Sequence, residues 1–456
     1  MRGGSGKTTL SLGLLRALRD KGLSVVSFKK GPDYIDAGWL SIASGKPCYN
    51  LDPFLIGEKN ILPSFLAHSK GADLAIIEGN RGIFDGMDLE GSQSTARLAK
   101  MLKAPVILIL DATKMTRTGA ALVLGVKKFE PGLSLGGVVL NQIAGKRHET
   151  ILRQAIEHYT GVPVIGAIPR FKAKLSERHM GLVPFHEHPG MEEAVGEAKK
   201  LVTQSVDLDK VLKIARKAPR LDRSLPKLKK ARPSGIRIGV LKDSAFQFYY
   251  PENLEALRGE GAELLEVSPL LKKTAELPDI DALYIGGGFP ETHALPLSKN
   301  KSFLNSLKDK IEEGLPVYAE CGGLMYLGES LLLNGRKFEM AGVFPYSFAL
   351  EERPVAHGYS IAECTTGKNP FYEKGAVLHG HEFHYSRPVK EVPNKEGAAK
   401  PLFTLKMKRG TGIEGGRDGL TYKNCFATYT HTHALGSPGW AKGMIEAARG
   451  YKARQG

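Results

Sequence analysis

Residues 2–9 (RGGSGKTT) have the composition and spacing of a loop that binds nucleotide phosphates. Glycines let several backbone N–H groups converge on a phosphate, and the helix that starts there adds positive potential. In this pattern Lys7 reaches the outer phosphates and the hydroxyl of Thr8 holds Mg²⁺. The leucines that follow recur at helical spacing, which predicts an amphipathic helix directly after the loop. We therefore predict ATP and Mg²⁺ as cofactors, with the phosphates bound by Gly3, Gly4, Ser5, Gly6, Lys7, Thr8 and Thr9.

The loop departs from the usual pattern at its start. Met1 stands where GxxxxGK has its first glycine, and no strand precedes the loop in this sequence. Phosphate loops normally follow a buried strand. Either that strand lies upstream of Met1 or the sheet lacks its central strand, and we favour the first explanation.

Two acidic motifs follow predicted strands in the same half of the chain. GPDYID contains Asp33 and Asp36, and IIEGNRGIFDG contains Glu78 and Asp85. Because ligands of parallel sheets bind at the carboxyl ends of the strands, we expect these carboxylates beside the phosphate loop. There they suit Mg²⁺ binding and the positioning of a phosphoryl acceptor. Ordinary turn chemistry is the alternative, since Asp beside Gly or Pro is common in loops.

Cys321 has the sequence surroundings of a catalytic nucleophile. Residues 316–323 (PVYAECGG) are an apolar run followed by a cysteine and two glycines. This order predicts a sharp strand-to-helix turn that presents the thiol. A lone buried cysteine is more often inert packing. Here the turn coincides with candidates for the other parts of a nucleophilic site, and we favour catalysis.

Those other parts are an oxyanion hole and a base. The N–H directly after the nucleophile is placed to donate to an oxyanion, and a triple-glycine turn after another predicted strand offers further donors. A cysteine nucleophile also needs a base, and residues 428–433 (TYTHTH) supply His431 and His433. The residues predicted to hold the oxyanion are Gly287, Gly288 and Gly322.

The elements that must position these residues alternate between strands and helices, which predicts parallel sheets covered by helices. A stretch rich in Lys, Arg and Pro over residues 210–237 divides the pattern and is the best domain boundary. The predicted domains are 1–205 and 236–456, joined by a basic linker over 206–235. Strands are expected at 23–28, 74–78, 106–111, 135–141, 236–241, 263–267, 282–285 and 316–319, and helices at 8–21, 95–102, 251–260 and 302–313.

Composition excludes several classes of protein. The 456 residues include 42% apolar and 25% charged residues, which are the values of a soluble globular protein of two or three domains. The apolar runs are too short to span a membrane, and the four cysteines form no CxxC pair, so a reduced cytoplasmic setting is expected. The net charge of +16 comes without a nucleic-acid motif, and a solvated linker or a polyanionic small-molecule partner accounts for it.

Ten motifs together resemble the cobyrinic acid a,c-diamide synthases and their hydrogenobyrinate and nickel-sirohydrochlorin relatives. They cover nearly the whole chain, and FKKGPDYID and GHEFHYSR favour the diamide synthases over the other cobalamin amidotransferase. The resemblance implies an α/β fold, with a P-loop, dethiobiotin synthetase-like parallel-sheet domain followed by a class I glutamine amidotransferase domain. The motifs are RGGSGKTT, FKKGPDYID, IIEGNRGIFDG, GVVLNQI, ERHMGLVP, FYYPENLEAL, GGGFPETH, YAECGGLMYLG, GHEFHYSR and TYTHTHALGSPGWA.

The resemblance also implies a reaction. ATP would phosphorylate a peripheral carboxylate of a tetrapyrrole, and ammonia released from glutamine at Cys321 would pass between the domains and attack the acyl phosphate. His431 matches the base of the glutaminase site, and Asn141 falls where the family reads adenine. Mg²⁺ is expected on Thr8 and Glu78. The residues that fall where the family activates the carboxylate are Asp33, Tyr34, Asp36, Glu78 and Asp85.

One feature of the glutaminase motif is unusual. Ordinary class I amidotransferases have an acid two residues after the histidine, whereas this sequence has His433 there. We therefore expect a Cys–His dyad in which no carboxylate orients the imidazole.

Other functions fit parts of the sequence. Partitioning ATPases of the deviant phosphate-loop group share GGxGKTT, but Arg2 stands where they have a signature lysine, and they have no use for Cys321. A nucleic-acid binder rests on charge alone. The choice among cobyrinate, hydrogenobyrinate and nickel-sirohydrochlorin leaves no motif and stays open. The expected partners are glutamine and a polycarboxylate tetrapyrrole, with no nucleic acid and no membrane, and a homodimer stays open.

Overall fold

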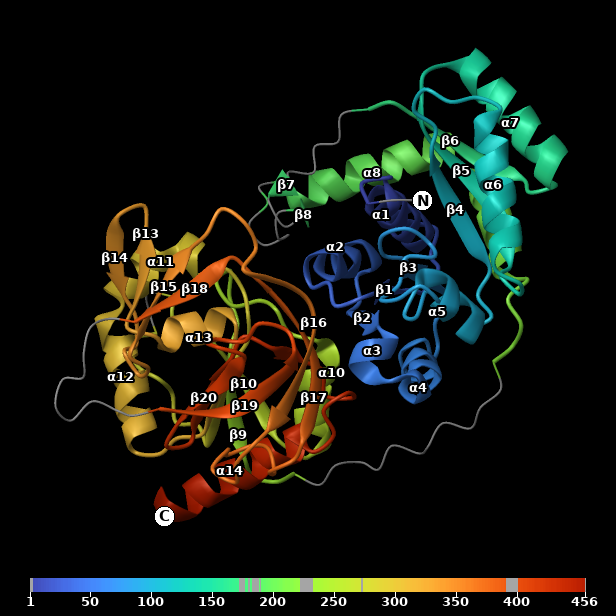
Figure 1. The fold of residues 1–456 in the computed structure, drawn as a ribbon. Helices are drawn as coiled ribbons and strands as arrows, with labels where there is room; N and C mark the ends of the chain where they lie inside the picture. The colour runs from blue at the N-terminus through green and yellow to red at the C-terminus, as the bar shows by residue number, and fades with distance from the viewer. Residues whose placement is uncertain are drawn as a thin grey trace. The chain divides into compact units, whose positions relative to one another are not determined.

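The computed structural model describes residues 3–171, 177–178, 181–182, 188, 190–221, 233–271, 274–390 and 401–455 (Figure 1). The chain divides into two compact units. Unit 1 consists of Met1–Pro53 and Gly57–Lys227, and unit 2 consists of Phe54–Ile56 and Leu228–Gly456. Each unit has its own sheets and its own buried apolar clusters.

The first sheet of unit 1 is parallel and has the strand order β2-β1-β3. All six residues of β1 are buried, which is typical of a parallel strand covered on both faces. The strands are β1 (Val25–Lys30), β2 (Cys48–Leu51) and β3 (Leu74–Glu78), and the helices of this part are α1 (Lys7–Asp20), α2 (Ile35–Ser44), α4 (Glu58–His68) and α5 (Thr95–Met101). The short helix α3 (Pro53–Ile56) belongs to unit 2 except for Pro53.

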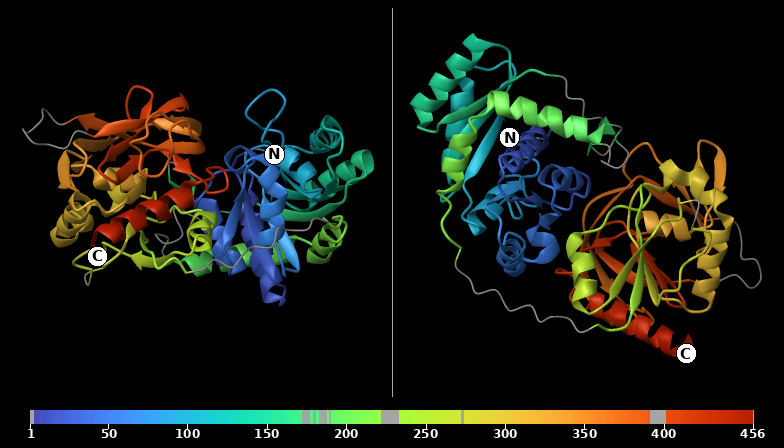
Figure 2. Two further views of the ribbon diagram at one scale, coloured as in Figure 1. Left: turned by 90° about the horizontal axis from the view of Figure 1, so that it is seen from below. Right: turned by 180° about the vertical axis from the view of Figure 1, so that it is seen from behind.

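The second sheet of unit 1 is also parallel, with the order β4-β5-β6, and helices cover both of its faces. Leu108 and Val138 pack against α6 and α7, whereas Ile109 and Val139 pack with α1 and α8. Figures 1 and 2 show these two helix pairs on opposite sides of the sheet. The elements are β4 (Val106–Asp111), β5 (Leu135–Ile143), β6 (Val164–Pro169), α6 (Thr118–Phe129), α7 (Lys146–Thr160) and α8 (Met191–Ser205), with the short strands β7 (Glu177–Arg178) and β8 (Gly181–Leu182).

Unit 1 therefore contains two three-stranded sheets rather than one continuous sheet. Among the described residues no strand precedes the phosphate loop, because residues 3–6 form a turn and bend that lead directly into α1. This helix contacts β1 and β3 of the first sheet and packs on Ile109 of the second. Both sheets are thus anchored to the helix that starts at the loop.

A basic linker was expected over residues 206–235. The first part of this segment instead forms a helix, α9 (Leu208–Ala215). Leu208, Val211 and Ile214 are buried in the apolar cluster on the α1 face of the second sheet. The basic residues between them, such as Lys210 and Lys213, face solvent. Charge pattern alone suggested a linker because the solvent face of an amphipathic helix has the same composition.

Unit 2 is built on a ten-stranded mixed sheet with the order β10-β9-β11-β12-β21-β20-β19-β16-β17-β22. Its first five strands are parallel and the others are antiparallel. The strands in chain order are β9 (Arg237–Leu241), β10 (Glu263–Val267), β11 (Ala282–Ile285), β12 (Val317–Glu320), β16 (Ala356–Cys364), β17 (Val377–His384), β19 (Leu402–Arg409), β20 (Arg417–Tyr422), β21 (Cys425–Thr428) and β22 (His431–Thr432).

Helices cover both faces of the parallel part of this sheet. Leu283 and Val317 pack with α12, whereas Ile238 and Tyr284 pack with α10 and α14, and Figure 1 shows α12 and α14 on opposite sides. A second sheet has the order β14-β13-β15-β18. The remaining elements are α10 (Pro251–Gly259), α11 (Ala294–Lys299), α12 (Lys301–Glu312), α13 (Gly322–Leu327), α14 (Trp440–Gln455), β13 (Ser330–Leu333), β14 (Arg336–Glu339), β15 (Tyr346–Leu350) and β18 (Ser386–Lys390).

The predicted elements are confirmed with small shifts of their ends. Strands expected at 74–78, 106–111, 263–267 and 282–285 have the observed bounds. The α/β class with parallel sheets in both halves is therefore as expected. No helix among the described residues has the length and apolar character that a membrane crossing requires.

Candidate active sites

The phosphate loop of unit 1 is held by an asparagine from the second sheet. Gly6 has a φ of 91°, in the left-handed region that favours glycine. A Cβ atom at this position would lie 2.5 Å from Nδ2 of Asn141. The same nitrogen donates a hydrogen bond of 2.9 Å to the carbonyl oxygen of Ser5. The structure thus places Asn141 against the loop backbone, and its contact with adenine stays a prediction.

A buried lysine joins the two acidic motifs. Nζ of Lys29 lies 2.6 Å from Asp36 Oδ2 and 2.6 Å from Glu78 Oε1. Thr8 Oγ1 donates to the same Glu78 oxygen at 3.0 Å. The Lys29 and Glu78 side chains are almost fully buried. The expected meeting of both motifs with the start of α1 is therefore present in the structure.

The other acidic residues lie around this cluster. Asp33 Oδ1 accepts a hydrogen bond from the N–H of Asp36 at 2.9 Å, and burial together with the Asp36 carboxylate raises the pKa of Asp33 to about 7. Asp85 Oδ2 accepts a hydrogen bond of 2.7 Å from the N–H of Gly82 and so holds its own loop. The hydroxyl oxygen of Tyr34 is buried.

The electrostatics of the loop fit an anionic ligand. Burial lowers the pKa of Lys7, and the Lys29 ammonium lowers it further, although Glu78 and Asp36 act in the opposite direction. A nucleotide phosphate would stabilise the charged form of Lys7 in this setting. Within the residues described, no group of three or more His, Cys, Asp or Glu side chains is arranged to hold a metal ion. Mg²⁺ bound with a nucleotide needs fewer protein ligands, because phosphates and waters supply the rest.

In unit 2, Cys321 occupies a strained turn between β12 and α13. Its φ of 47° is unusual for a residue with a side chain, and strain of this kind often marks a functional site. The N–H of Cys321 donates to the carbonyl oxygen of Thr428 in the neighbouring strand β21 at 2.7 Å. The predicted strand-to-helix turn at the nucleophile is therefore present.

The three glycines predicted to form the oxyanion hole lie beside this turn. A Cβ atom at Gly322 would lie 3.0 Å from the backbone nitrogen of Gly288. A Cβ atom at Gly287 would lie 2.4 Å from Cε1 of His431. These close approaches bring the glycine turn, the elbow and the histidine together, and side chains at the glycines would fill the space between them.

His431 lies between the thiol and a carboxylate that the sequence interpretation missed. Burial alone would lower the pKa of His431, but interactions with Cys321 and Glu320 outweigh it and raise the pKa to about 10. His431 Nδ1 is 3.5 Å from Glu320 Oε2. The ring of His431 also stacks on His381, with ring centroids 4.9 Å apart. A carboxylate that the sequence interpretation did not anticipate thus lies beside His431, and the expectation that no carboxylate orients the imidazole stays untested.

His433 has a different environment from His431. Its Nε2 lies 3.4 Å from Oε1 of Glu252 on α10, and both side chains are buried. Its Nδ1 accepts a hydrogen bond from the N–H of Leu435 at 3.2 Å. The two histidines of the TYTHTH motif thus face separate carboxylates.

Two functional candidates, Lys29 and Glu320, escaped the sequence interpretation, as did Glu252, the buried neighbour of His433. Both Lys29 and Glu320 do have a local signal, because Glu320 is the charged last residue of the buried strand β12 and Lys29 is one of two lysines that end the buried strand β1. Such residues are rarely buried without a partner. Glu252 sits in the first turn of a helix, where a glutamate is ordinary, and it has no comparable signal.

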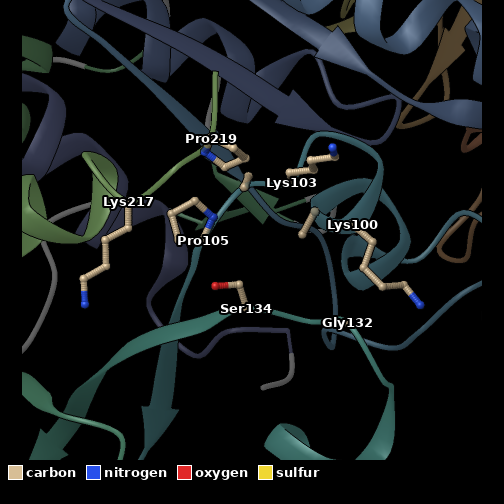
Figure 3. Close-up of a pocket in the computed structure, with 9 residues that line it drawn as sticks. Lys100, Lys103, Pro105, Gly132, Ser134, Lys217 and Pro219 are labelled. Carbon is tan, nitrogen blue, oxygen red and sulfur yellow. The ribbon is translucent and has the colours of Figure 1, made fainter. Parts of the chain in front are cut away.

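The pocket shown in Figure 3 is not part of either site. It has a volume of about 240 Å³ and lies at the amino ends of β4 and β5, beside Pro105 and Ser134. Asn141 and the phosphate loop are at the other end of β5. The ammonium groups of Lys100, Lys103 and Lys217 point in different directions in Figure 3 and do not converge on one ligand position.

Comparisons with known proteins match both units. The family described as CobQ/CobB/MinD/ParA nucleotide binding domain matches residues 1–183, and the CobB/CobQ-like glutamine amidotransferase domain matches residues 237–439. Among solved structures, a glutamine amidotransferase from Thermotoga maritima aligns with 48% of this chain and 92% of its own, with 13% identity and a TM-score of 0.32.

Relatives are similar over nearly the whole chain. A cobyrinate a,c-diamide synthase from Magnetococcus marinus is 44% identical, covering 96% of this chain and 94% of its own. Proteins of the same name from Archaeoglobus fulgidus and Methanobrevibacter smithii are 42% and 38% identical, with 97% of this chain covered in each case and 95% and 96% of their own. A nucleotide-binding unit and a glutamine amidotransferase unit thus make up one glutamine-dependent ligase, and the protein belongs to the cobyrinate a,c-diamide synthase family.

Proposed function

We propose that this enzyme amidates the a and c carboxylates of cobyrinate, with ATP as the energy source and glutamine as the source of ammonia. The observation that supports this most strongly is the presence in one chain of two separate sites. One is a phosphate loop joined to buried carboxylates through Thr8 and Glu78. The other is a cysteine elbow whose thiol interacts with His431.

In the glutaminase site, Cys321 attacks the side-chain amide carbon of glutamine as the thiolate. The N–H groups of Gly287, Gly288 and Gly322 are proposed to donate to the oxyanion of the tetrahedral intermediate, and the close approach of Gly322 to the nitrogen of Gly288 supports this. Protonated His431 gives its proton to the amide nitrogen, the C–N bond breaks and ammonia leaves a thioester. Water then gives a proton to His431 and attacks the thioester, which releases glutamate and restores the thiol.

In the synthetase site, the loop N–H groups and Lys7 hold the phosphates of ATP. An oxygen of the substrate carboxylate attacks the γ-phosphorus and ADP leaves. Ammonia then attacks the acyl carbon, phosphate departs, and the amide loses the extra proton. Asp33, Tyr34, Asp36 and Asp85 are proposed to position the acceptor carboxylate.

Thr8 and Glu78 would hold Mg²⁺. Both offer hard oxygen atoms, and Glu78 Oε2 is buried with no hydrogen-bond partner among the described residues, which leaves it available to a cation. The ion supplies neutralisation of phosphate charge when it is bound.

The macrocycle is the least constrained part of this function. The relatives are named cobyrinate a,c-diamide synthases, so cobyrinate is the proposed macrocycle. Hydrogenobyrinate and nickel-sirohydrochlorin are the alternatives. The net charge of +16 supports any substrate with many carboxylates. The test is incubation with ATP, Mg²⁺, glutamine and each macrocycle in turn, with products resolved by mass. Two amidations of cobyrinate are expected, and a preference for another macrocycle would overturn the assignment.

A cytoplasmic location, a homodimer and the absence of nucleic-acid and membrane partners remain parts of this proposal. All four cysteines are buried, and none of them, all being described residues, forms a disulfide, which supports a reducing compartment. Sedimentation of the purified chain tests the homodimer. A partitioning ATPase is disfavoured, because such a protein has no use for a thiol held between His431 and three glycines.

A further inference from the structure

Glu320 occupies a position that ordinary packing does not explain. It is the last residue of β12, it directly precedes the nucleophile, and it is fully buried. A carboxylate is costly to bury, and such groups are found inside proteins only with partners. Its strand neighbours Val317, Tyr318 and Ala319 are buried too.

The partners of Glu320 fix its orientation. Oε1 accepts hydrogen bonds from the N–H of Thr432 at 3.1 Å and from Thr432 Oγ1 at 3.0 Å. Oε2 accepts from the hydroxyl of Tyr284 at 3.4 Å and lies 3.5 Å from His431 Nδ1. The residue that carries the Oε1 donors directly follows His431 in β22. The carboxylate is therefore tied to the same strand end that presents the imidazole.

In ordinary class I amidotransferases an acid stands two residues after the histidine, and this position has another residue and another contact here. His433 stands two residues after His431 and pairs with Glu252, at 3.4 Å between Nε2 and Oε1. No carboxylate can come to His431 from that position. The distance of 3.5 Å from Glu320 to His431 exceeds a normal N–H···O bond, so the resting contact is mainly electrostatic. Catalytic hydrogen bonds of ligand-free sites are often long and shorten with substrate.

We propose that Glu320 is the positioning residue for His431. The carboxylate of this glutaminase site is then supplied by the residue before the nucleophile instead of the segment after the histidine. Its role is to hold the Nδ1 side of the ring, to fix the tautomer, and to stabilise the imidazolium that forms when His431 takes the thiol proton. One strand then supplies both the nucleophile and the group that orients its base. This inference rests on the glutaminase role proposed above for Cys321 and His431.

The test uses Glu320→Gln, which keeps the shape of the side chain and one acceptor oxygen for Thr432. Glutamine hydrolysis should fall by roughly 10²- to 10⁴-fold, mainly in kcat, as is typical when a base loses its orienting acid. Amidation with ammonium salts should remain. Alkylation of Cys321 by iodoacetamide should need a higher pH than in the parent enzyme, because the imidazolium that supports the thiolate loses its anionic partner. Glu320→Asp should restore part of the rate.

Glu252→Gln is the matched control, because it neutralises another buried carboxylate, which lies beside His433 rather than beside His431. It should leave the alkylation profile unchanged. Glu320→Gln with unchanged hydrolysis and an unchanged alkylation profile would overturn the positioning role while leaving the glutaminase site intact. Equal effects of Glu252→Gln and Glu320→Gln would also overturn it. If Cys321→Ala still hydrolyses glutamine, the proposed glutaminase site itself is wrong.

Discussion

Lys29 and Glu78 face each other across neighbouring parallel strands, with Nζ and Oε1 2.6 Å apart and both side chains almost fully buried. The same ammonium lies 2.6 Å from Asp36. One positive charge thus separates two carboxylates from different motifs and holds Glu78 beside Thr8 at the start of α1.

We expect Lys29→Met to destabilise unit 1 by about 3–5 kcal/mol, because it leaves buried carboxylates uncompensated. Urea denaturation followed by circular dichroism measures this change. Lys199→Met is the control, since its pair with Asp20 is partly exposed and should contribute only about 0–1 kcal/mol. Similar losses in both variants would contradict the central position of Lys29.

Asp33→Asn should change the pH dependence of stability. The pKa of Asp33 is raised from 3.8 to about 7, so between these values the folded protein holds a proton that the unfolded chain releases. Stability of the parent enzyme therefore falls as pH rises through this window. The asparagine variant lacks this loss, and its stability relative to the parent should rise from about pH 4 to pH 7. Denaturation midpoints across this range test it, and a constant difference would show that Asp33 does not titrate there.

Cys321→Ala should abolish amidation with glutamine and leave amidation with ammonium salts. The reason is that the thiol and the phosphate loop belong to different units. Product formation with each nitrogen source is the measurement. Cys364→Ala, which removes another thiol of the same unit, should keep both activities. Loss of the ammonium-driven reaction in a folded Cys321→Ala enzyme would contradict the division of labour.

Lys7→Ala should remove synthesis with either nitrogen source. Lys7 is the loop residue proposed to reach the outer phosphates, and neutralisation of their charge is a large part of phosphoryl-transfer catalysis. ATP turnover with glutamine and then with ammonium is the assay. Lys21→Ala, at the exposed far end of α1, is the control and should be nearly neutral. Rates near the parent value at saturating ATP would contradict the assignment of Lys7 to the outer phosphates.

The two histidines of the TYTHTH motif should contribute unequally to glutamine hydrolysis. His431→Ala should lower glutamine hydrolysis by about 10²- to 10⁴-fold through loss of the general base. His433→Ala should cost clearly less, because His433 lies beside Glu252, whereas His431 is the histidine that interacts with the thiol. Alkylation of Cys321 across a pH series distinguishes them. The base is misassigned if the His431→Ala profile matches that of the parent enzyme.

Local chemistry in the sequence determined much of this protein. The phosphate loop, the elbow at Cys321 and strands such as 263–267 follow from periodicity, glycine placement and helix starts, which act over a few residues. Family motifs added His431 as the predicted base. Each of these features could be recognised without knowing what lies across the fold.

Only the tertiary structure decided which charged groups meet. Lys29 lies beside Glu78 because of the register of their strands. Glu320 lies beside His431 because β12 and β22 end at the same place. Glu252 reaches His433 from a separate helix. Residues of this kind have no spacing rule, because they lie far apart in the chain and become neighbours only when the sheets form. The sequence did not predict helix α9 for the converse reason. Its basic face has the composition of a linker, and only the structure shows that its apolar face is buried.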